Sequence, residues 1–191
     1  MLRMSVLTDI SAQSAPLIVR DGLSDDWEAC LHIDPAYSTE HVWQMERDAE
    51  PGRVGVTFRT VRLPRPMRVV AARDADAIRQ AWAQRDCFLV ALVGGQVRGY
   101  LTMQVDMDHY NGWVRDFTVD AAWRRRGIGG ALLKAARQWA REHRLSHVTI
   151  ETQTKNYPAI RFCEKYGLAF SGFNDNYYPN QDIALFFAQR P

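Results

Sequence analysis

Residues 119–136 read VDAAWRRRGIGGALLKAA and join an apolar strand to an amphipathic helix through a short turn rich in arginine and glycine. The first backbone N–H groups of a helix have no partner within the helix, and the helix dipole adds partial positive charge there. Such a turn therefore suits an anion. Glycine lets a ligand approach the main chain closely, and arginine offers charged donors. We expect this turn to hold a pyrophosphate-bearing cofactor.

The spacing of the glycines narrows the choice of cofactor. The Walker pattern G-x-x-x-x-G-K-[ST] is absent, and the glycines do not complete the dinucleotide fingerprint G-x-G-x-x-G. What remains is R-x-x-G-x-G, formed by Arg124, Gly127 and Gly129. Preceded by the apolar strand expected at 114–119, this pattern resembles the acetyl-CoA site of the GNAT N-acetyltransferase superfamily.

A second segment strengthens the resemblance. Residues 150–168, IETQTKNYPAIRFCEKYGL, look like the family's other cofactor segment, a strand followed by Asn-x-x-Ala and a short helix that ends at glycine. The resemblance implies acetyl-CoA as co-substrate, and a bulged strand whose backbone N–H groups face its pantetheine and acetyl groups. The residues expected to bind the cofactor are Phe117, Thr118, Val119, Arg124, Arg125, Arg126, Gly127, Ile128, Gly129, Gly130 and Asn156.

Two of these assignments have simpler alternatives. A basic turn is often only a solvated surface, and Asn156 is also placed to cap the helix that follows it. Residues 121–147 carry seven Lys or Arg against one acid, so they could steer CoA or a nucleic acid. The glycines favour CoA, and we expect no nucleic-acid partner.

With acetyl-CoA as cofactor, a neutral amine attacks the thioester carbonyl, and a thiolate leaves through a tetrahedral oxyanion. The amine must lose a proton, and the best candidates for the base are Asp116 and Glu151, each near the end of a strand expected to border the cofactor. A carboxylate at a strand end is also commonly a solvated or capping group. Either acid can instead bind a cationic substrate.

The proton donor to the leaving thiolate departs from the family's pattern. The usual register Asn-x-x-Ala-x-x-x-Tyr places a tyrosine where this chain has Cys163. Tyr166 lies three residues further on, roughly one helical turn away. Both side chains are protonated at pH 7 when unperturbed, so Cys163 and Tyr166 are the two candidates. The alternative for Cys163 is a small buried hydrophobe.

The acceptor is suggested by weaker similarity. Residues 111–113, 172–178 and 183–187 are similar to streptothricin-type antibiotic acetyltransferases within the superfamily. This implies a small-molecule amine with several positive charges, met by one of four acids. The competing hypotheses are an acetyltransferase acting on protein N-termini or lysines, and a non-catalytic module that binds acyl-CoA. The four acids are Asp106, Asp108, Asp116 and Asp175.

Composition bounds the class of protein. With 191 residues, 47% apolar and 24% charged, the chain suits one globular domain. No apolar run approaches the roughly 20 residues that span a bilayer, so we expect a soluble protein with no membrane partner. Three cysteines without a C-x-x-C pair favour a reducing cytoplasm over a disulfide scaffold or zinc site. His143 and His147 lack an H-E-x-x-H context, so no metal is expected.

Patterning along the chain predicts an α/β fold, a single GNAT-like domain with a mixed, mostly antiparallel central sheet flanked by helices. Residues 1–16 are expected to be a flexible lead-in without a signal-peptide core, and residues 17–191 the N-acetyltransferase domain. A homodimer is compatible with the sequence. Strands are expected at 17–20, 37–45, 54–61, 87–93, 97–105, 114–119, 147–151, 169–178 and 183–188, and helices at 24–33, 74–84, 158–166 and from 128 through at least 140, with an extended connector at 63–66 and a polar loop at 106–112.

Overall fold

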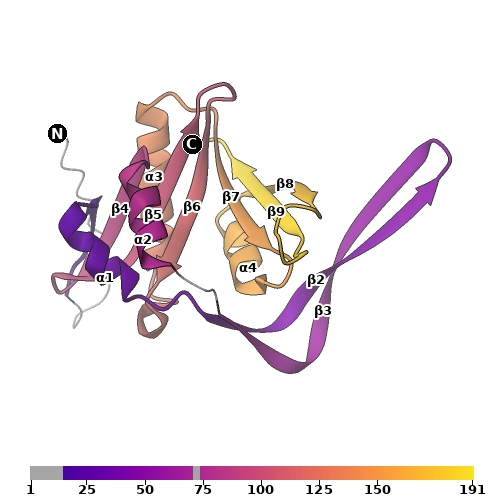
Figure 1. Ribbon diagram of the computed structural model, residues 1–191, viewed down its shortest axis with the longest axis horizontal. Helices are drawn as coiled ribbons and strands as arrows, with labels where there is room; N and C mark the ends of the chain where they lie inside the picture. Colours follow the sequence, from indigo (N-terminus) through magenta and orange to yellow (C-terminus); the bar gives the residue numbers. More distant parts are fainter. Residues whose placement is uncertain (1–14, 71–73) are drawn as a thin grey trace. The chain divides into compact units, whose positions relative to one another are not determined.

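The computed structural model describes residues 15–70 and 74–191 (Figure 1). Residues 1–14, most of the expected lead-in, lie outside this part. The chain divides into two compact units. The first comprises residues 1–35, 71–150 and 188–191, and the second comprises residues 36–70 and 151–187. Each unit is described by itself below.

The first unit is built on a sheet with hydrogen-bonded strand order β1-β4-β5-β6-β7. Neighbouring strands are antiparallel from β1 through β6, whereas β6 and β7 are parallel. This confirms the mixed, mostly antiparallel sheet. The strands are β1 (Leu17–Asp21), β4 (Cys87–Val93), β5 (Gln96–Asp106), β6 (Asn111–Val119) and β7 (His147–Gln153).

The β4–β5 hairpin turns at two glycines, which lie between the strands expected at 87–93 and 97–105. Gly94 and Gly95 have φ of 60° and 76°, the left-handed values that a two-residue hairpin turn requires. The predicted loop at 106–112 was too long. Strand β5 runs to Asp106 and β6 begins at Asn111, because Asp106 and Asn111 pair in the ladder.

Helices cover both faces of this sheet. Tyr100 of β5 packs its ring edge-on against Trp82, at 5.1 Å between centroids, on the face covered by the shorter helices. Its neighbour Gly99 points the other way, because side chains alternate along a strand. A Cβ on Gly99 would lie 3.2 Å from Ile128 and 3.3 Å from Leu132, so α3 lies close against that face. The helices are η1 (Ser24–Asp26), α1 (Trp27–Leu31), α2 (Ala75–Ala83), η2 (Ala121–Trp123) and α3 (Ile128–Glu142).

Local sequence explains where these helices begin and which side they bury. Asp74 caps α2, since its carboxylate accepts hydrogen bonds from the N–H groups of Asp76 and Ala77. The amphipathic helix expected within residues 119–136 is confirmed as part of α3, which buries one apolar face. Its members are almost inaccessible to solvent: Ile128, Leu132, Leu133, Ala136 and Ala140.

The second unit contains a long hairpin and a small sheet with strand order β7-β9-β8. Its core is aromatic. Trp43 lies 5.8 Å from Phe58 and from Phe187, and 5.9 Å from Phe170, between ring centroids. The elements are β2 (Tyr37–Glu50), β3 (Arg53–Val69), α4 (Tyr157–Lys165), β8 (Ala169–Asn174) and β9 (Ala184–Gln189), with the last residues of β7.

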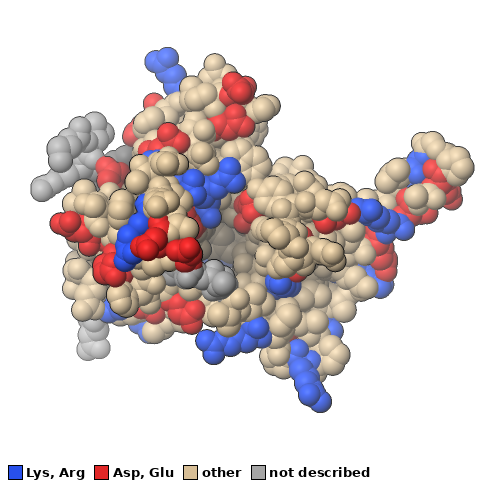
Figure 2. All heavy atoms as spheres, in the orientation of Figure 1, with Lys and Arg blue, Asp and Glu red and all other residues tan. Residues whose placement is uncertain are grey.

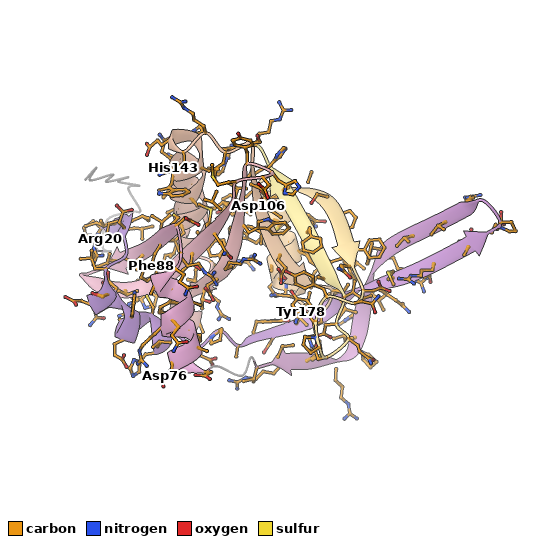
Figure 3. All side chains as sticks on the ribbon, turned by 45° about the horizontal axis from the view of Figure 1, so that its top comes forward. Arg20, Asp76, Phe88, Asp106, His143 and Tyr178 are labelled. Carbon is orange, nitrogen blue, oxygen red and sulfur yellow. The ribbon has the colours of Figure 1, made fainter. Side chains whose placement is uncertain are left out.

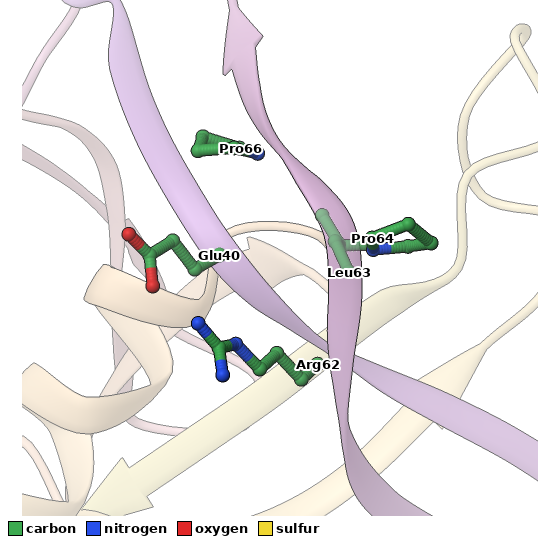
Figure 4. A pocket seen from close by; sticks show the side chains of 5 residues that line it. All are labelled: Glu40, Arg62, Leu63, Pro64 and Pro66. Carbon is green, nitrogen blue, oxygen red and sulfur yellow. The ribbon is translucent and has the colours of Figure 1, made fainter.

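The predicted connector at 63–66 is instead an irregularity inside β3. Thr39 pairs with Met67 and His41 pairs with Arg62, so four residues of β3 face Glu40 alone. Proline has no N–H to lose from the ladder, so Pro64 and Pro66 are tolerated in this bulge. A shallow hollow of about 510 Å³ opens there, with Glu40 and Arg62 reaching into it from opposite strands (Figure 4).

The first closing strand is shorter than predicted, and the second is shifted by one residue. Strand β8 ends at Asn174, and Tyr177 and Tyr178 belong to the turn that follows it. Among the residues that the structure covers, no helix has the length and apolarity needed to cross a membrane.

Candidate functional site

The basic turn, residues 120–130, follows β6 directly and opens α3. Asp120 starts it by accepting a hydrogen bond from the N–H of Ala122 at 3.1 Å, which caps η2. Two residues then take left-handed backbone angles, Arg125 with φ of 66° and Gly127 with φ of 85°. A non-glycine residue pays for this geometry, whereas glycine adopts it freely. The chain therefore reverses sharply just before the helix.

The start of α3 presents backbone donors. The N–H of Ala131 bonds the carbonyl of Gly127 at 3.0 Å and closes the first helical turn. The preceding N–H groups, of Ile128, Gly129 and Gly130, are the first-turn donors that no intrahelical carbonyl can reach. Gly127 is the N-cap and has no side chain to occupy them. This end of the helix, with its positive dipole, is suited to a phosphate.

The three arginines of the basic turn do different work. Arg124 donates from Nε to the carbonyl of Val119 at 2.9 Å and from Nη2 to the carbonyl of Asp34 at 3.1 Å. Its guanidinium thus ties the turn to β6 and to the end of the α1 segment. Arg125 and Arg126 are exposed. Arg125 and Arg126 are therefore the arginines best placed to bind an anion, whereas Arg124 stabilises the conformation of the turn.

Strand β6 has a bulge just before the residues expected to face the cofactor. Thr102 of β5 pairs with Asp116, but the next residue, Met103, pairs with Val114, so Arg115 is an extra residue on β6. The parallel ladder with β7 ends at Val114. The bulged strand that the family resemblance implied is therefore present, immediately upstream of residues 117–119.

Asp116 accepts two hydrogen bonds from residues of the first unit. Its Oδ2 accepts from the indole Nε1 of Trp82 at 3.1 Å and from Oγ1 of Thr102 at 2.7 Å. Trp82 and Thr102 are 3% and 0% exposed, so both donors are buried. The carboxylate satisfies them and connects α2 to β5 and β6. Sequence reasoning proposed Asp116 as a base but did not find these partners, which come from distant segments.

The expected acids Asp106 and Asp108 lie beside the end of β6 that is opposite the basic turn. They belong to the β5–β6 hairpin beside Asn111, and Asn111 lies eight residue steps from Val119 along β6, about 26 Å. Asp106 accepts from His109 at 2.9 Å, and this bond, with backbone N–H donors, lowers the pKa of Asp106 (Figure 3). A hollow of about 430 Å³ lies there. These two acids are therefore remote from the basic turn.

In the second unit, Glu151 accepts hydrogen bonds from two tyrosine hydroxyl groups. Tyr177 donates its hydroxyl to Oε2 of Glu151 at 2.6 Å, and Tyr178 donates to Oε1 at 2.7 Å. Burial and the neighbouring carboxylate raise the pKa of Tyr178, so this phenol stays neutral. The labelled Tyr178 of Figure 3 marks the loop after β8 from which both phenols come. Sequence reasoning named Glu151 and missed the phenols; the adjacent pair of tyrosines was the available signal.

Other polar groups of the second unit either form ion pairs or are buried. Asp175, one of the four expected acids, forms an ion pair with Arg47. Asp182 forms one with Lys155. The hydroxyl of Tyr37 is buried and has no hydrogen-bond partner among the described residues. Burial, with the charge of Asp182, raises the pKa of Tyr37.

Helix α4 holds the remaining predicted residues. Asn156 is its N-cap and accepts from the N–H of Ala159 at 3.2 Å, so the capping interpretation is confirmed. Cys163 is 0% exposed, and burial raises the pKa of its thiol to about 12. Tyr166 ends the helix with its ring 4.6 Å from that of Phe162. The contact of Asn156 with a cofactor, and proton donation by Cys163 or Tyr166, stay predictions.

The predicted site residues thus fall into two groups. The first unit brings together Asp116, the strand residues 117–119 and the basic turn. The second unit holds Glu151 and the α4 residues. Figure 2 shows basic and acidic side chains interspersed on the visible face. The described residues contain no cluster of three or more His, Cys, Asp or Glu side chains placed to hold a metal ion.

Comparison with known proteins adds the family. The model of the acetyltransferase (GNAT) family matches residues 57–168. Streptothricin acetyltransferase of Streptomyces lavendulae is 24% identical over 164 residues, which are 83% of this chain and 85% of that protein. The L-amino acid N-acetyltransferase AaaT of Escherichia coli K12 is 27% identical over 140 residues, 58% of this chain and 86% of that protein.

Solved structures agree on the fold. Nourseothricin acetyltransferase superposes with a TM-score of 0.79 at 23% identity, covering 91% of this chain and 98% of that one. A Bacillus anthracis str. Ames protein in complex with acetyl coenzyme A superposes with a TM-score of 0.71 at 21% identity, covering 92% and 97%. The α/β architecture predicted from the sequence is therefore that of these neighbours.

Proposed function

Because the chain belongs to the acetyltransferase (GNAT) family and is thus an acetyl-CoA-dependent N-acetyltransferase, we propose that it acetylates a primary amine of a cationic small molecule, with streptothricin-type antibiotics first among the candidates. The transfer is direct, within a complex of enzyme, acetyl-CoA and amine. We also place the reaction in a reducing cytoplasm, since Cys30, Cys87 and Cys163 are all buried thiols outside any disulfide.

The observation that carries the proposal is the basic turn. Gly127 at φ of 85° leaves the first N–H groups of α3 uncovered, and the exposed side chains of Arg125 and Arg126 stand beside them. Backbone donors and guanidinium groups together fit the pyrophosphate of CoA. The bulge at Arg115 redirects the backbone just before Phe117, which supports a role for residues 117–119 beside the acyl group.

The reaction needs one bond made, one broken and two proton transfers. The amine nitrogen bonds the thioester carbonyl carbon, the C–S bond breaks, and the products are an amide and CoA thiol. The amine proton goes to a carboxylate base, and the thiolate takes up a proton. We assign proton removal to Glu151 and regard Asp116 as the alternative. Both carboxylates accept two hydrogen bonds, but the donors to Asp116 are buried, whereas one donor to Glu151, Tyr177, is exposed to solvent.

The phenols around Glu151 support a cationic acceptor. A tyrosine hydroxyl donates one hydrogen bond and still accepts others, so Tyr177 can donate to Glu151 and accept from an ammonium group. Tyr177 is 39% exposed and thus reachable from solvent. The relative from S. lavendulae carries streptothricin in its name, which supports an antibiotic amine as the first compound to test.

A thiol-release assay across a panel of amines tests this function. Streptothricin, aminoglycoside-like amines, polyamines, free amino acids and peptides with free N-termini should be compared at fixed acetyl-CoA. The proposal expects the largest kcat/KM with a cationic small molecule. Peptides as the best substrates would favour the alternative, a protein N-terminal or lysine acetyltransferase. If calorimetry detects CoA binding but no amine in the panel gives thiol release, a non-catalytic acyl-CoA-binding module would be favoured.

A further inference from the structure

Trp123 carries two guanidinium groups over its ring at the edge of the basic turn. The Cζ atom of Arg98 is 4.9 Å from the ring centroid, and that of Arg126 is 4.8 Å from it. Both distances lie well within the range of a cation–π interaction, and tryptophan is the strongest aromatic partner for a cation. We call these three residues the Trp123 stack. None of them was singled out by the sequence motif except Arg126.

The stack is fixed to the sheet through Arg98. Its Nη1 pairs with the carboxylate of Asp120 at 3.2 Å, and the N–H of Asp120 bonds the carbonyl of Arg98 at 2.9 Å. Asp120 also caps η2, the short helix that ends at Trp123. Arg98 and Asp120 are about three-quarters buried, so this ion pair is not an exposed surface pair. The indole ring is therefore held in place before any ligand arrives.

Arg126 is the most solvent-exposed member of the stack. It is exposed, on a long side chain that loses much rotational freedom whenever it is fixed. A guanidinium lying over an aromatic ring keeps its N–H donors around the rim, where they can still bond a phosphate. The ring thus reduces the conformational entropy that the side chain of Arg126 loses when an anion binds.

From this geometry we propose that Trp123 is a positioning residue that holds the guanidinium of Arg126 ready for a phosphate group of CoA. The proposal rests on the proposed function and adds to it a second source of cofactor affinity, outside the backbone donors of α3. Trp123 acts through Arg126 and not on the acetyl group, so it affects cofactor binding and not the rate of the chemical step.

The experiment combines calorimetry with CoA and steady-state kinetics. Trp123→Leu should weaken CoA binding about threefold to tenfold and raise the KM for acetyl-CoA to match, with kcat within twofold. Arg126→Gln should give at least that loss, because it removes the guanidinium itself. The double variant should bind no more weakly than Arg126→Gln alone, because without the guanidinium Trp123 has no cation to position. Trp123→Phe should restore most of the affinity, since a smaller ring still binds a cation.

A matched control lies at the other end of β6. The Cζ atom of Arg115 lies 5.7 Å from the centroid of the Trp113 ring, so this pair is also a cation–π contact. Because it is far from the basic turn along β6, Trp113→Leu should leave CoA affinity unchanged. Additive losses in the double variant, or a Trp123→Phe variant as weak as Trp123→Leu, would overturn the positioning role. Thermal melts of each variant identify misfolding, and Arg126→Gln and Trp123→Phe test the idea even if Trp123→Leu does not fold. Failure of the wild type to bind CoA would instead refute the proposed function.

Discussion

The indole N–H of Trp82 donates to the carboxylate of Asp116 across 34 residues of sequence, at 3.1 Å. This bond links α2 to the strand that leads into the basic turn. It also gives Asp116 a structural task that is independent of any catalytic one. The two tasks can be separated, because an asparagine oxygen still accepts hydrogen bonds but cannot take up the amine proton.

Asp116→Ala should lower the free energy of unfolding by about 1–3 kcal/mol, since it leaves buried donors on Trp82 and Thr102 unsatisfied. Asp116→Asn should recover most of that stability and keep kcat within tenfold of wild type. Urea unfolding and thiol release measure the two quantities. A hundredfold fall in kcat for a stable Asp116→Asn would move the base assignment from Glu151 to Asp116.

Glu151→Gln should reduce kcat by about a hundredfold or more, as expected when a general base is removed. CoA affinity, measured by calorimetry, should not change. Tyr177→Phe is the matched control: it removes one donor at 2.6 Å but keeps the carboxylate, so it should raise the KM for the amine more than it lowers kcat. Full activity in Glu151→Gln would refute the role.

Gly127→Ala should cost about 1–2 kcal/mol of stability and raise the KM for acetyl-CoA, because φ of 85° strains any residue with a Cβ. Gly55→Ala is the control. A Cβ at Gly55 would meet its nearest atoms at an ordinary 3.6 Å, and Gly55 does not have a positive φ. Thermal melts and kinetics compare the two. Equal effects of both substitutions would contradict the argument.

Cys163→Ala should keep turnover within about threefold of wild type, since a fully buried thiol with its pKa raised to about 12 is poorly placed to exchange protons. A thiol reagent such as Ellman's reagent should label Cys163 only after unfolding. Tyr166→Phe, made in parallel, tests the other predicted donor. Loss of turnover in a well-folded Cys163→Ala protein would restore the thiol as the acid.

Asp26→Asn should destabilise the protein in a pH-dependent way. Burial raises the pKa of Asp26, but hydrogen bonds from Arg20 and from the N–H of Leu23 outweigh it and hold the pKa below its ordinary value. A lowered folded-state pKa stabilises above the unfolded-state pKa, near 4, and the gain disappears as pH falls through the folded value. The stability gap between wild type and variant, from urea unfolding, should be about 1–3 kcal/mol at pH 7 and should narrow below about pH 4. Parallel pH profiles would contradict this.

Elements with strong local signals could be predicted from the sequence. Glycines at 94 and 95 specify a hairpin, and the 3.6-residue spacing of Ile128, Leu132 and Ala136 specifies the buried face of α3. The basic turn could be predicted because its backbone conformation requires glycine, and the glycines are visible in the sequence. These signals act over a few residues.

What could not be predicted depends on contacts between distant segments. The bond between Trp82 and Asp116, and the phenols on Glu151, need the fold to bring segments together. Strand β3 passes through two prolines because the bulge needs no ladder N–H there, a tertiary feature that local preference argued against. The strand predicted at 169–178 begins at the expected residue but ends at Asn174. Aromatic residues favour strands by composition, whereas Tyr177 and Tyr178 belong to a turn.

The tip of the β2–β3 hairpin offers a practical use (Figure 1). Glu50 and Arg53 close the ladder there, Gly52 has nothing within 4 Å of the place a Cβ would take, and Val54 is 79% exposed. Exposed turns of this kind accept insertions readily. A fluorescent label or affinity tag placed between Pro51 and Gly52 would therefore report on the working enzyme without entering its chemistry.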